Sequence, residues 1–359
     1  MSISALDARL RVPLRALTSA CRFAALLAAA PAPAQGPPAA ALGPAQLAVI
    51  VNDDDPNSVA VAAHYREARG IPSANMVHVR IPGRPRKLSA AQFATLKADI
   101  DRQLGPDIQA VAMLWTAPYA VECNAITAAY TLGFDASLCA KTCGPGKISS
   151  YFNAAGAKPY TERGMRLAML LPTDSVEQAR DLIARGVASG FRAPAAGAYY
   201  LATGETARNS RAPYFPRAGA VPQRRLTIHV RRAETLEDAR DIMVYQTGKA
   251  SVDKLETLGF LPGALADHLT SFGGDLYGTA QMSSLRWLEA GATASYGTVS
   301  EPCNYWQKFP HPTVLLSQYL RGATAIEAYW KSVAWPGQGL FIGEPLAAPY
   351  RAAPYRAAR

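Results

Sequence analysis

Two apolar runs separated by a short helical pattern constrain the fold of this 359-residue chain most. The first run begins at Leu261 and ends in a polar stretch followed by two glycines, and the second covers residues 291–299. Between them, residues 281–291 repeat apolar side chains at helical spacing. A strand, a helix and a strand in this order form a right-handed crossover between parallel strands. We therefore expect the polar stretches after both strands at one edge of a sheet, where open α/β sheets bind ligands.

The same alternation of strand and helix patterns runs through most of the chain. Before residue 119 it predicts strands and helices at 47–51, 59–69, 76–81, 90–103 and 108–115. After residue 161 it predicts strands at 166–171, 198–202, 226–230, 242–245 and 340–346. Helices are predicted at 175–189, 313–320 and 323–333, with a short one from Leu236. Alternation of this kind predicts an α/β fold with a mainly parallel sheet flanked by helices.

The pattern places a single α/β domain over residues 45–346, interrupted once. Residues 119–161 are rich in Gly, Pro, Ser and Cys and are interpreted as an irregular insertion over one end of the sheet. Residues 1–34 carry four arginines, a short apolar run and a small-x-small site at Ala32-Pro-Ala34, which is typical of a secretory signal peptide. A disordered Ala/Pro leader is the alternative. Residues 35–44 are predicted to be a linker, and residues 347–359 a basic disordered tail.

These features predict an exported protein, periplasmic or extracellular. No later apolar run reaches the roughly 20 residues that a membrane span requires. The net charge is +10, but the arginines lie scattered in residues 208–232 and in the tail, outside any recognisable nucleic-acid-binding module. Residues 208–232 are interpreted as a solvated basic loop. No nucleic-acid partner is therefore expected. No GxGxxG motif follows a predicted strand, and the sequence indicates no cofactor.

Four cysteines follow the predicted leader, and an even number in an exported chain favours disulfides. Cys139 and Cys143 lie close together in the insertion, while Cys123 and Cys303 each follow a predicted strand. The expected pairs are therefore Cys139 with Cys143 and Cys123 with Cys303. Zinc is the alternative, but neither a histidine nor a second cysteine pair stands at ligand spacing, so no metal site is expected.

The functional cleft is predicted at the carboxyl ends of the strands that finish at residues 245, 271 and 299. The candidate catalytic residues combine a possible base with two nucleophiles: His268, Ser271 and Cys303. The candidate binding residues are polar groups at the same strand ends: Asp53, Asp54, Gln246, Asp267 and Glu301. Each has a structural alternative, namely hydrogen bonding within the strand-end loops, a disulfide for Cys303, and a turn or helix start for the aspartates.

Several of these segments resemble an uncharacterised family of exported bacterial proteins. They are residues 58–72, Gly263-Ala-Leu-Ala-Asp-His-Leu-Thr-Ser-Phe-Gly-Gly274, Gly297-Thr-Val-Ser-Glu-Pro-Cys303 and Gly343-Glu-Pro-Leu346. More distantly, the second half resembles gingipain-like peptidases of the caspase-like fold, which implies a three-layer architecture. Such peptidases place a His-Gly pair after one strand and a catalytic cysteine after the next. By order these positions fall near Gln246-Thr-Gly248 and Leu269-Thr-Ser271, where neither residue is present.

Three functions follow from these observations as alternatives. The first is a peptidase-like hydrolase with a rebuilt site at the carboxyl edge of the sheet. The second is a catalytically inactive relative that binds peptide or glycan at the same strand ends. The third is a structural protein of the cell envelope.

Overall fold

The computed structural model describes residues 42–190 and 194–351. The predicted signal peptide, residues 1–34, lies outside these ranges, as do residues 35–41 of the predicted linker and residues 352–359 of the predicted tail. The described residues belong to one compact unit. Within them, the structure contains no helix that is long and apolar enough to cross a membrane.

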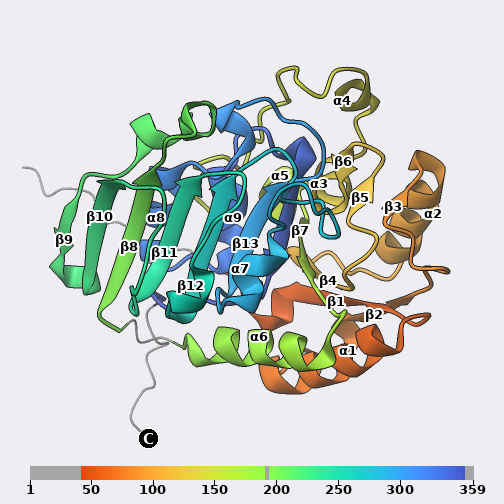
Figure 1. The fold of residues 1–359 in the computed structure, drawn as a ribbon. Coiled ribbons are helices and arrows are strands. Elements are labelled where there is room, and N and C mark those ends of the chain that lie inside the picture. Colours follow the sequence, from red (N-terminus) through yellow and green to blue (C-terminus); the bar gives the residue numbers. More distant parts are fainter. Residues whose placement is uncertain (1–41, 191–193, 352–359) are drawn as a thin grey trace, which may run out of the picture. The chain divides into compact units, whose positions relative to one another are not determined.

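An eleven-stranded sheet forms the centre of this unit (Figure 1), in the order β2-β1-β4-β7-β14-β13-β12-β11-β8-β10-β9. The strands are β1 (Leu47–Asn52), β2 (Met76–Val79), β4 (Ala110–Leu114), β7 (Leu167–Leu171), β8 (Ala196–Ala202), β9 (Gly219–Val221), β10 (Leu226–Arg232), β11 (Ile242–Gly248), β12 (Phe260–Leu269), β13 (Ala294–Thr298) and β14 (Gly339–Gly343). Most neighbours pair in parallel, whereas β13 with β14 and β9 with β10 are antiparallel. The predicted α/β class with a mainly parallel sheet is confirmed.

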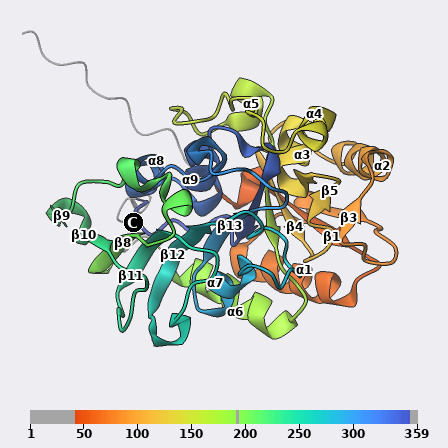
Figure 2. The same ribbon diagram turned by 45° about the horizontal axis from the view of Figure 1, so that its top comes forward.

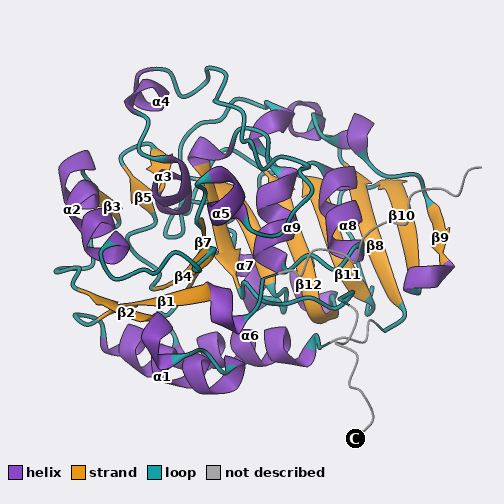
Figure 3. Ribbon diagram, turned by 180° about the vertical axis from the view of Figure 1, so that it is seen from behind, coloured by secondary structure: helices purple, strands orange, loops and turns teal. Residues whose placement is uncertain are grey.

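Helices cover both faces of the sheet and give it three layers (Figures 2 and 3). One layer contains α1 (Pro56–Arg69), α6 (Val176–Ala188) and α7 (Leu285–Glu289). The other contains α3 (Ile126–Leu132), α5 (Pro159–Arg163), α8 (Pro312–Leu320) and α9 (Ala325–Ser332), while α2 (Ala90–Asp101) packs beside β2. Covered on both faces, every residue of β1, β4, β7, β13 and β14 is buried. This is why β4 and β7 read as unbroken apolar runs.

The last strand in the sequence, β14, lies in the middle of the sheet between β7 and β13. Glu344 follows it and is completely buried, where its carboxylate accepts hydrogen bonds from the Tyr65 hydroxyl at 2.7 Å and the Arg69 Nε at 3.0 Å. Gly186 of α6 leaves room for it, because a Cβ there would lie 2.3 Å from a Glu344 carboxylate oxygen. The Gly343-Glu-Pro motif therefore ties β14 to α1 and α6.

The insertion holds more regular structure than its sequence predicts. Residues 119–161 contribute β5 (Ala120–Val121) and β6 (Asn124–Ala125), which form a small sheet with β3 (Lys87–Leu88), and also α4 (Ala136–Ala140). Helix α3 packs against β7 and β14 and is buried on nearly every side. It therefore lacks the amphipathic pattern that identifies a surface helix. Conversely, the short helix predicted from Leu236 is absent, since residues 233–241 are irregular.

The packed chain also continues past residue 346, where the basic tail was expected to begin. Residues 347–350 are buried, and the Tyr350 ring packs edge-on against Tyr319 with 5.9 Å between ring centroids. Arg351 Nη2 donates a hydrogen bond of 2.7 Å to the Leu42 carbonyl, which belongs to the expected linker. Burial of Leu42 and of residues 347–350, together with the hydrogen bond from Arg351, thus holds the two limits of the domain.

Candidate functional site

The carboxyl ends of strands from both halves of the sheet meet at one edge. Thr298, the last residue of β13, donates from its hydroxyl to the Ser271 carbonyl beyond β12 at 2.9 Å. The loop that follows β12 reaches the other half, where the Tyr277 hydroxyl donates to Asp174 beyond β7 at 2.6 Å. Gly297 of β13 lets the loop after β12 approach that strand closely, because a Cβ there would lie 2.3 Å from the Gly273 backbone. The predicted neighbourhood of the two polar stretches is therefore present.

Asp267 belongs to a buried polar network beneath this edge. Gln246 of β11 lies opposite Asp267 in register and donates to it from Nε2 at 2.9 Å. Arg211 forms an ion pair with Asp267, and its Nη2 donates to the Thr247 carbonyl at 2.9 Å. The Arg211 and Asp267 side chains are only 2% and 1% exposed. A charge pair this deep, whose guanidinium donates further hydrogen bonds to backbone carbonyls, holds strands together and is closed to a ligand.

Arg211 was missed by the sequence, which assigned residues 208–232 to a solvated basic loop. The structure corrects that assignment for this residue, because the loop folds inward at Ala212–Tyr214 and carries the guanidinium under β11 and β12. No local pattern marks it, since its partner Asp267 lies 56 residues away in sequence.

His268 points to the opposite face of β12 from Asp267, as alternation along a strand requires. Its Nδ1 accepts a hydrogen bond from Trp287 Nε1 at 2.9 Å, and its Nε2 donates to the Met282 carbonyl at 3.1 Å. Burial lowers the pKa of His268 to about 3. The imidazole is therefore neutral at physiological pH with both ring nitrogens engaged, and neither is free to accept a proton from a nucleophile.

Ser271 is half-buried in the loop after β12. Among the described residues its hydroxyl has no hydrogen-bond partner, whereas the neighbouring Thr270 hydroxyl donates to Gln281 Oε1 at 2.7 Å. A serine becomes a nucleophile when a positioned base accepts its proton. His268, the base proposed for it, is occupied by Trp287 and Met282. The structure does not assemble this pair.

Cys303 is joined to Cys143 in a disulfide, and Cys123 is joined to Cys139. The expected pairing of Cys139 with Cys143 and of Cys123 with Cys303 is wrong. Helix α4 folds Cys139 back toward Cys123 beside β6, which leaves Cys143 to meet the loop after β13. In this state Cys303 carries no thiolate that could attack a substrate.

Glu301 accepts a hydrogen bond of 2.8 Å from the Cys303 backbone amide. Together with the sulfurs of Cys143 and Cys303 it brings three metal-ligating groups within 4.8 Å of one another. A metal needs deprotonated thiolates, however, and these two sulfurs are bonded to each other. Glu301 and the two cysteines therefore stabilise the loop after β13, through the hydrogen bond and the disulfide.

The aspartates after β1 adopt their structural alternative. Asp55 caps α1 by accepting from the Asn57 amide at 3.1 Å. Asp53 pairs with His78 at 2.7 Å and Asp54 with Arg80 at 3.0 Å. These partners follow or belong to β2, at the end of the sheet remote from β11 and β12. Asp53 and Asp54 are not brought together with Gln246 and His268.

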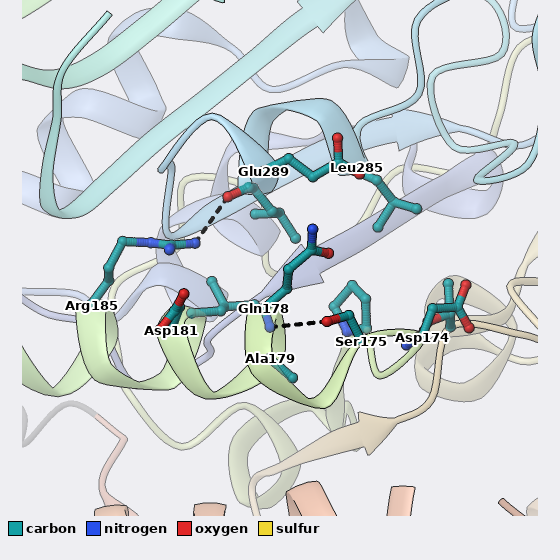
Figure 4. A pocket seen from close by; sticks show the side chains of 12 residues that line it. Asp174, Ser175, Gln178, Ala179, Asp181, Arg185, Leu285 and Glu289 are labelled. Carbon is teal, nitrogen blue, oxygen red and sulfur yellow. Dashed lines mark hydrogen bonds between the residues drawn. The ribbon is translucent and has the colours of Figure 1, made fainter. Parts of the chain in front are cut away.

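A cavity of about 170 Å³ opens beside the ends of β4 and β7, between α6 and α7 (Figure 4). Thr116 and Pro172 close it at the strand ends, and Leu182, Leu285 and Leu288 give it an apolar lining. The polar lining comes largely from one face of α6 and from a residue two positions before the helix: Asp174, Gln178, Asp181 and Arg185. Their spacing of four, three and four residues follows the helical repeat, so the sequence already indicated that these polar side chains share one helix face.

Carboxylates dominate the charge of this cavity. Asp174 accepts from Arg84 and from Tyr277, each at 2.6 Å, and Glu289 pairs with Arg286 at 2.6 Å. Within residues 42–190 and 194–351, the exposed Asp181 carboxylate has no hydrogen-bond or ion-pair partner.

Arg185 is the one cation in the lining, and it turns toward α7. Its Nη2 donates to the carbonyls of Leu288 at 2.9 Å and Ala292 at 3.3 Å. Burial lowers the pKa of Arg185, although an arginine remains charged at neutral pH. Because its donors are directed at these carbonyls, the cavity keeps an acidic character.

Comparison with protein-family models finds no matching family, and a search of curated proteins finds no matching protein. A solved chain described as "Structure of Protease" is similar, with 11% sequence identity and a TM-score of 0.47. The alignment covers 86% of this chain and 79% of that chain. A likeness of this degree carries no information on the chemistry of a site.

Proposed function

We propose that this chain is an exported binding protein that holds a cationic side chain at the carboxyl edge of its sheet and does not hydrolyse its ligand. The observation that carries the proposal is the cavity between α6 and α7, where three carboxylates surround an apolar floor. Two disulfides and the leader-like residues 1–34 support an oxidising compartment outside the cytoplasm.

The chemistry at the end of β12 favours binding over the alternative of a rebuilt hydrolase. Covalent hydrolysis needs a nucleophile beside a base that can take its proton. Here His268 has both ring nitrogens engaged, and the sulfur of Cys303 belongs to a disulfide. The residues at the sequence-predicted site thus support the loops next to the cavity.

The size and lining of the cavity favour a lysine or arginine side chain as the ligand group. Sites for whole small molecules usually measure about 300–1,000 Å³. A cavity of about 170 Å³ is suited to a single side chain or a small amine. The aliphatic stem of such a side chain would pack on Leu182 and Leu288, and its charged head would meet Asp181. A peptide with a basic residue is the ligand class that combines both features.

Calorimetric titration of the oxidised chain with N-acetyl-lysine methylamide tests this proposal. The norleucine analogue, which has the same stem without the charge, is the matched ligand control. We expect the lysine compound to bind, the norleucine compound to bind at least about tenfold more weakly, and added salt to weaken the lysine compound. Equal affinity for the two compounds would refute a cation site.

Variants locate the site. Asp181→Asn removes the unpartnered carboxylate and should weaken lysine binding by about tenfold, equivalent to about 1.4 kcal/mol. Glu67→Gln removes an exposed carboxylate of α1 outside the cavity and should leave binding unchanged. Peptide and ester screens on the wild-type chain should show no turnover. Turnover that is abolished by Ser271→Ala would restore the hydrolase alternative.

A further inference from the structure

Strand β10 has an open edge beyond β9, at the end of the sheet farthest from β2 (left in Figure 1). The short strand β9 pairs only with residues 226–228, whereas β10 continues to Arg232 and pairs with β8 along its whole length. Within the described part of the chain, residues 229–232 therefore have a neighbouring strand on one side only. At about 3.3 Å per residue, this open stretch is about 13 Å long.

The backbone groups of Val230 and Arg232 point away from β8, toward this open side. The amide of Ala233, directly after β10, donates to the Ala202 carbonyl of β8 at 3.2 Å. The N–H and C=O groups of successive residues in a strand point alternately to its two sides, so those of Arg232 and Val230 face the other way. On that side, neither residue has a backbone hydrogen bond to any residue that the structure describes. Such groups are the template on which an added strand forms.

Val230 adds apolar surface to the open stretch. Its side chain is 39% exposed, and it lies on the same face of β10 as Leu226 and Ile228, which are buried. A strand laid alongside residues 229–232 would cover it. The edge therefore offers both the backbone groups and the apolar contact that strand addition uses.

Three arginines lie around the open stretch. Arg231 and Arg232 are exposed and point to opposite faces of β10, and Arg217, also exposed, lies two positions before β9. Within residues 42–190 and 194–351, none of the three forms an ion pair or a side-chain hydrogen bond. This edge of the sheet is therefore cationic on both of its faces.

Charge selects the strand that can pair here. Glu234, the first acidic residue after β10, already accepts from the Gly204 amide at 2.5 Å. A second copy of the chain would bring its own Arg231 and Arg232 against these arginines, and like charges opposite each other destabilise a strand pair. Carboxylates on an added strand would instead meet an arginine on either face, and their attraction to the cationic edge speeds association. The edge disfavours its own copy and is complementary to an acidic strand.

We propose that the open edge of β10 binds an extended acidic segment of a partner protein as an added strand. The backbone of that segment would pair with Val230 and Arg232, and its Glu or Asp side chains would lie beside Arg231 and Arg232. Five strands separate β10 from β7 in the sheet. This surface is therefore distinct from the cavity between α6 and α7, and it does not depend on the function proposed for that cavity.

Fluorescence polarisation with a labelled acidic peptide tests the pairing. The probe is a seven-residue peptide in which glutamate and valine alternate, and its control is the same peptide methylated on every central amide nitrogen. The control keeps all the charges but cannot pair through either of its sides. We expect the probe to bind the full oxidised chain, the methylated peptide to bind at least about tenfold more weakly, and added salt to weaken the probe. A peptide with lysine in place of glutamate should not bind.

Variants locate the peptide. Arg232→Glu reverses a charge of the edge and should weaken the probe by at least about tenfold. Arg66→Glu reverses another exposed arginine, on α1, and should bind the probe as wild type does. Val230→Pro removes an amide that points to the open side and should also weaken the probe. If Val230→Pro does not fold, Arg232→Glu and the methylated peptide decide the question.

Four results would overturn the proposal. Equal affinity for the probe and its methylated control would mean that charge alone holds them. Wild-type binding by Arg232→Glu would place the peptide elsewhere. No binding of the probe at millimolar concentration would mean that the arginines only keep this edge from pairing. A dimer in analytical ultracentrifugation that Val230→Pro dissociates would show that a second copy occupies the edge.

Discussion

His268 should make the folded protein sensitive to acid, and the size of the effect follows from its surroundings. The pKa of the imidazole is about 3 in the fold because the ring is buried, against about 6.5 for histidine in an unfolded chain. As the pH falls, the unfolded state binds this proton first. The stability that the neutral ring contributes is therefore complete above pH 6.5 and is lost progressively toward pH 3. Between pH 7 and pH 4 the loss spans roughly 2.5 pH units, or about 3 kcal/mol at 1.36 kcal/mol per unit.

The variant His268→Gln isolates this contribution. A glutamine amide can accept from Trp287 and donate to the Met282 carbonyl, as the imidazole does, but it does not titrate. Urea denaturation of both proteins at pH 7 and pH 4 gives two free energies of unfolding for each. We expect the wild type to lose about 3 kcal/mol more than the variant between these pH values. Other groups, including His311, titrate in both proteins and cancel in the difference.

Two results would refute this reasoning. One is an equal loss of unfolding free energy in both proteins, and the other is an NMR titration of the His268 ring near pH 6.5. Either would mean that the imidazole is accessible to protons near neutrality. In that case His268 would again be a candidate general base for the neighbouring loop.

The remaining predictions concern the buried network, the disulfides and the leader. Asp267→Asn should lower the free energy of unfolding by about 3–5 kcal/mol because it leaves Arg211 buried without its partner. Urea denaturation should show that adding Arg211→Met recovers most of this loss. A double variant as unstable as the single one contradicts the pairing. Cys303→Ser removes the disulfide to Cys143, which spans 160 residues, and should lower the free energy of unfolding by about 2–5 kcal/mol. Non-reducing peptide mapping should find that bond, whereas alkylation of Cys303 in the native protein would disprove it. Mass spectrometry of the protein exported by its host should find an amino terminus near residue 35, and an intact residue 1 would exclude cleavage.

The sequence predicted the strands of the sheet well because the central ones are buried on both faces. A short continuous apolar run such as Ile108 to Trp115 fits a strand that is covered on both faces, so its apolar content alone indicates a strand. Helix ends with a polar cap were equally readable, as Ser89 and Ser175 show. Helix α3 was missed for the opposite reason, since a helix that is apolar on nearly every side has no period to detect.

Side-chain partnerships over long distances were beyond the sequence. Arg69 and Glu344 are 275 residues apart, and only the fold brings them together. Four cysteines permit three pairings, among which spacing cannot choose. For the candidate site, polar residues at strand ends suggested chemistry at His268. Its ring is in fact occupied by Trp287, which belongs to α7 and lies 19 residues further along the chain, and by the Met282 carbonyl, 14 residues further along. Only the fold brings these partners to the ring. The face of α6 from Asp174 to Arg185 was readable but resembled an ordinary solvated helix surface.

The central position of β14 determines when this polypeptide can fold. The strands before residue 172 form one block of the sheet and those from β8 to β13 form another, and the last strand in the sequence lies between them. Until residues 339–343 have been synthesised, β7 and β13 each have one edge without a partner strand. Pairing of this kind has high contact order and forms slowly. The central sheet therefore cannot be completed until the last strand has been made, and its two blocks are prone to aggregation until then.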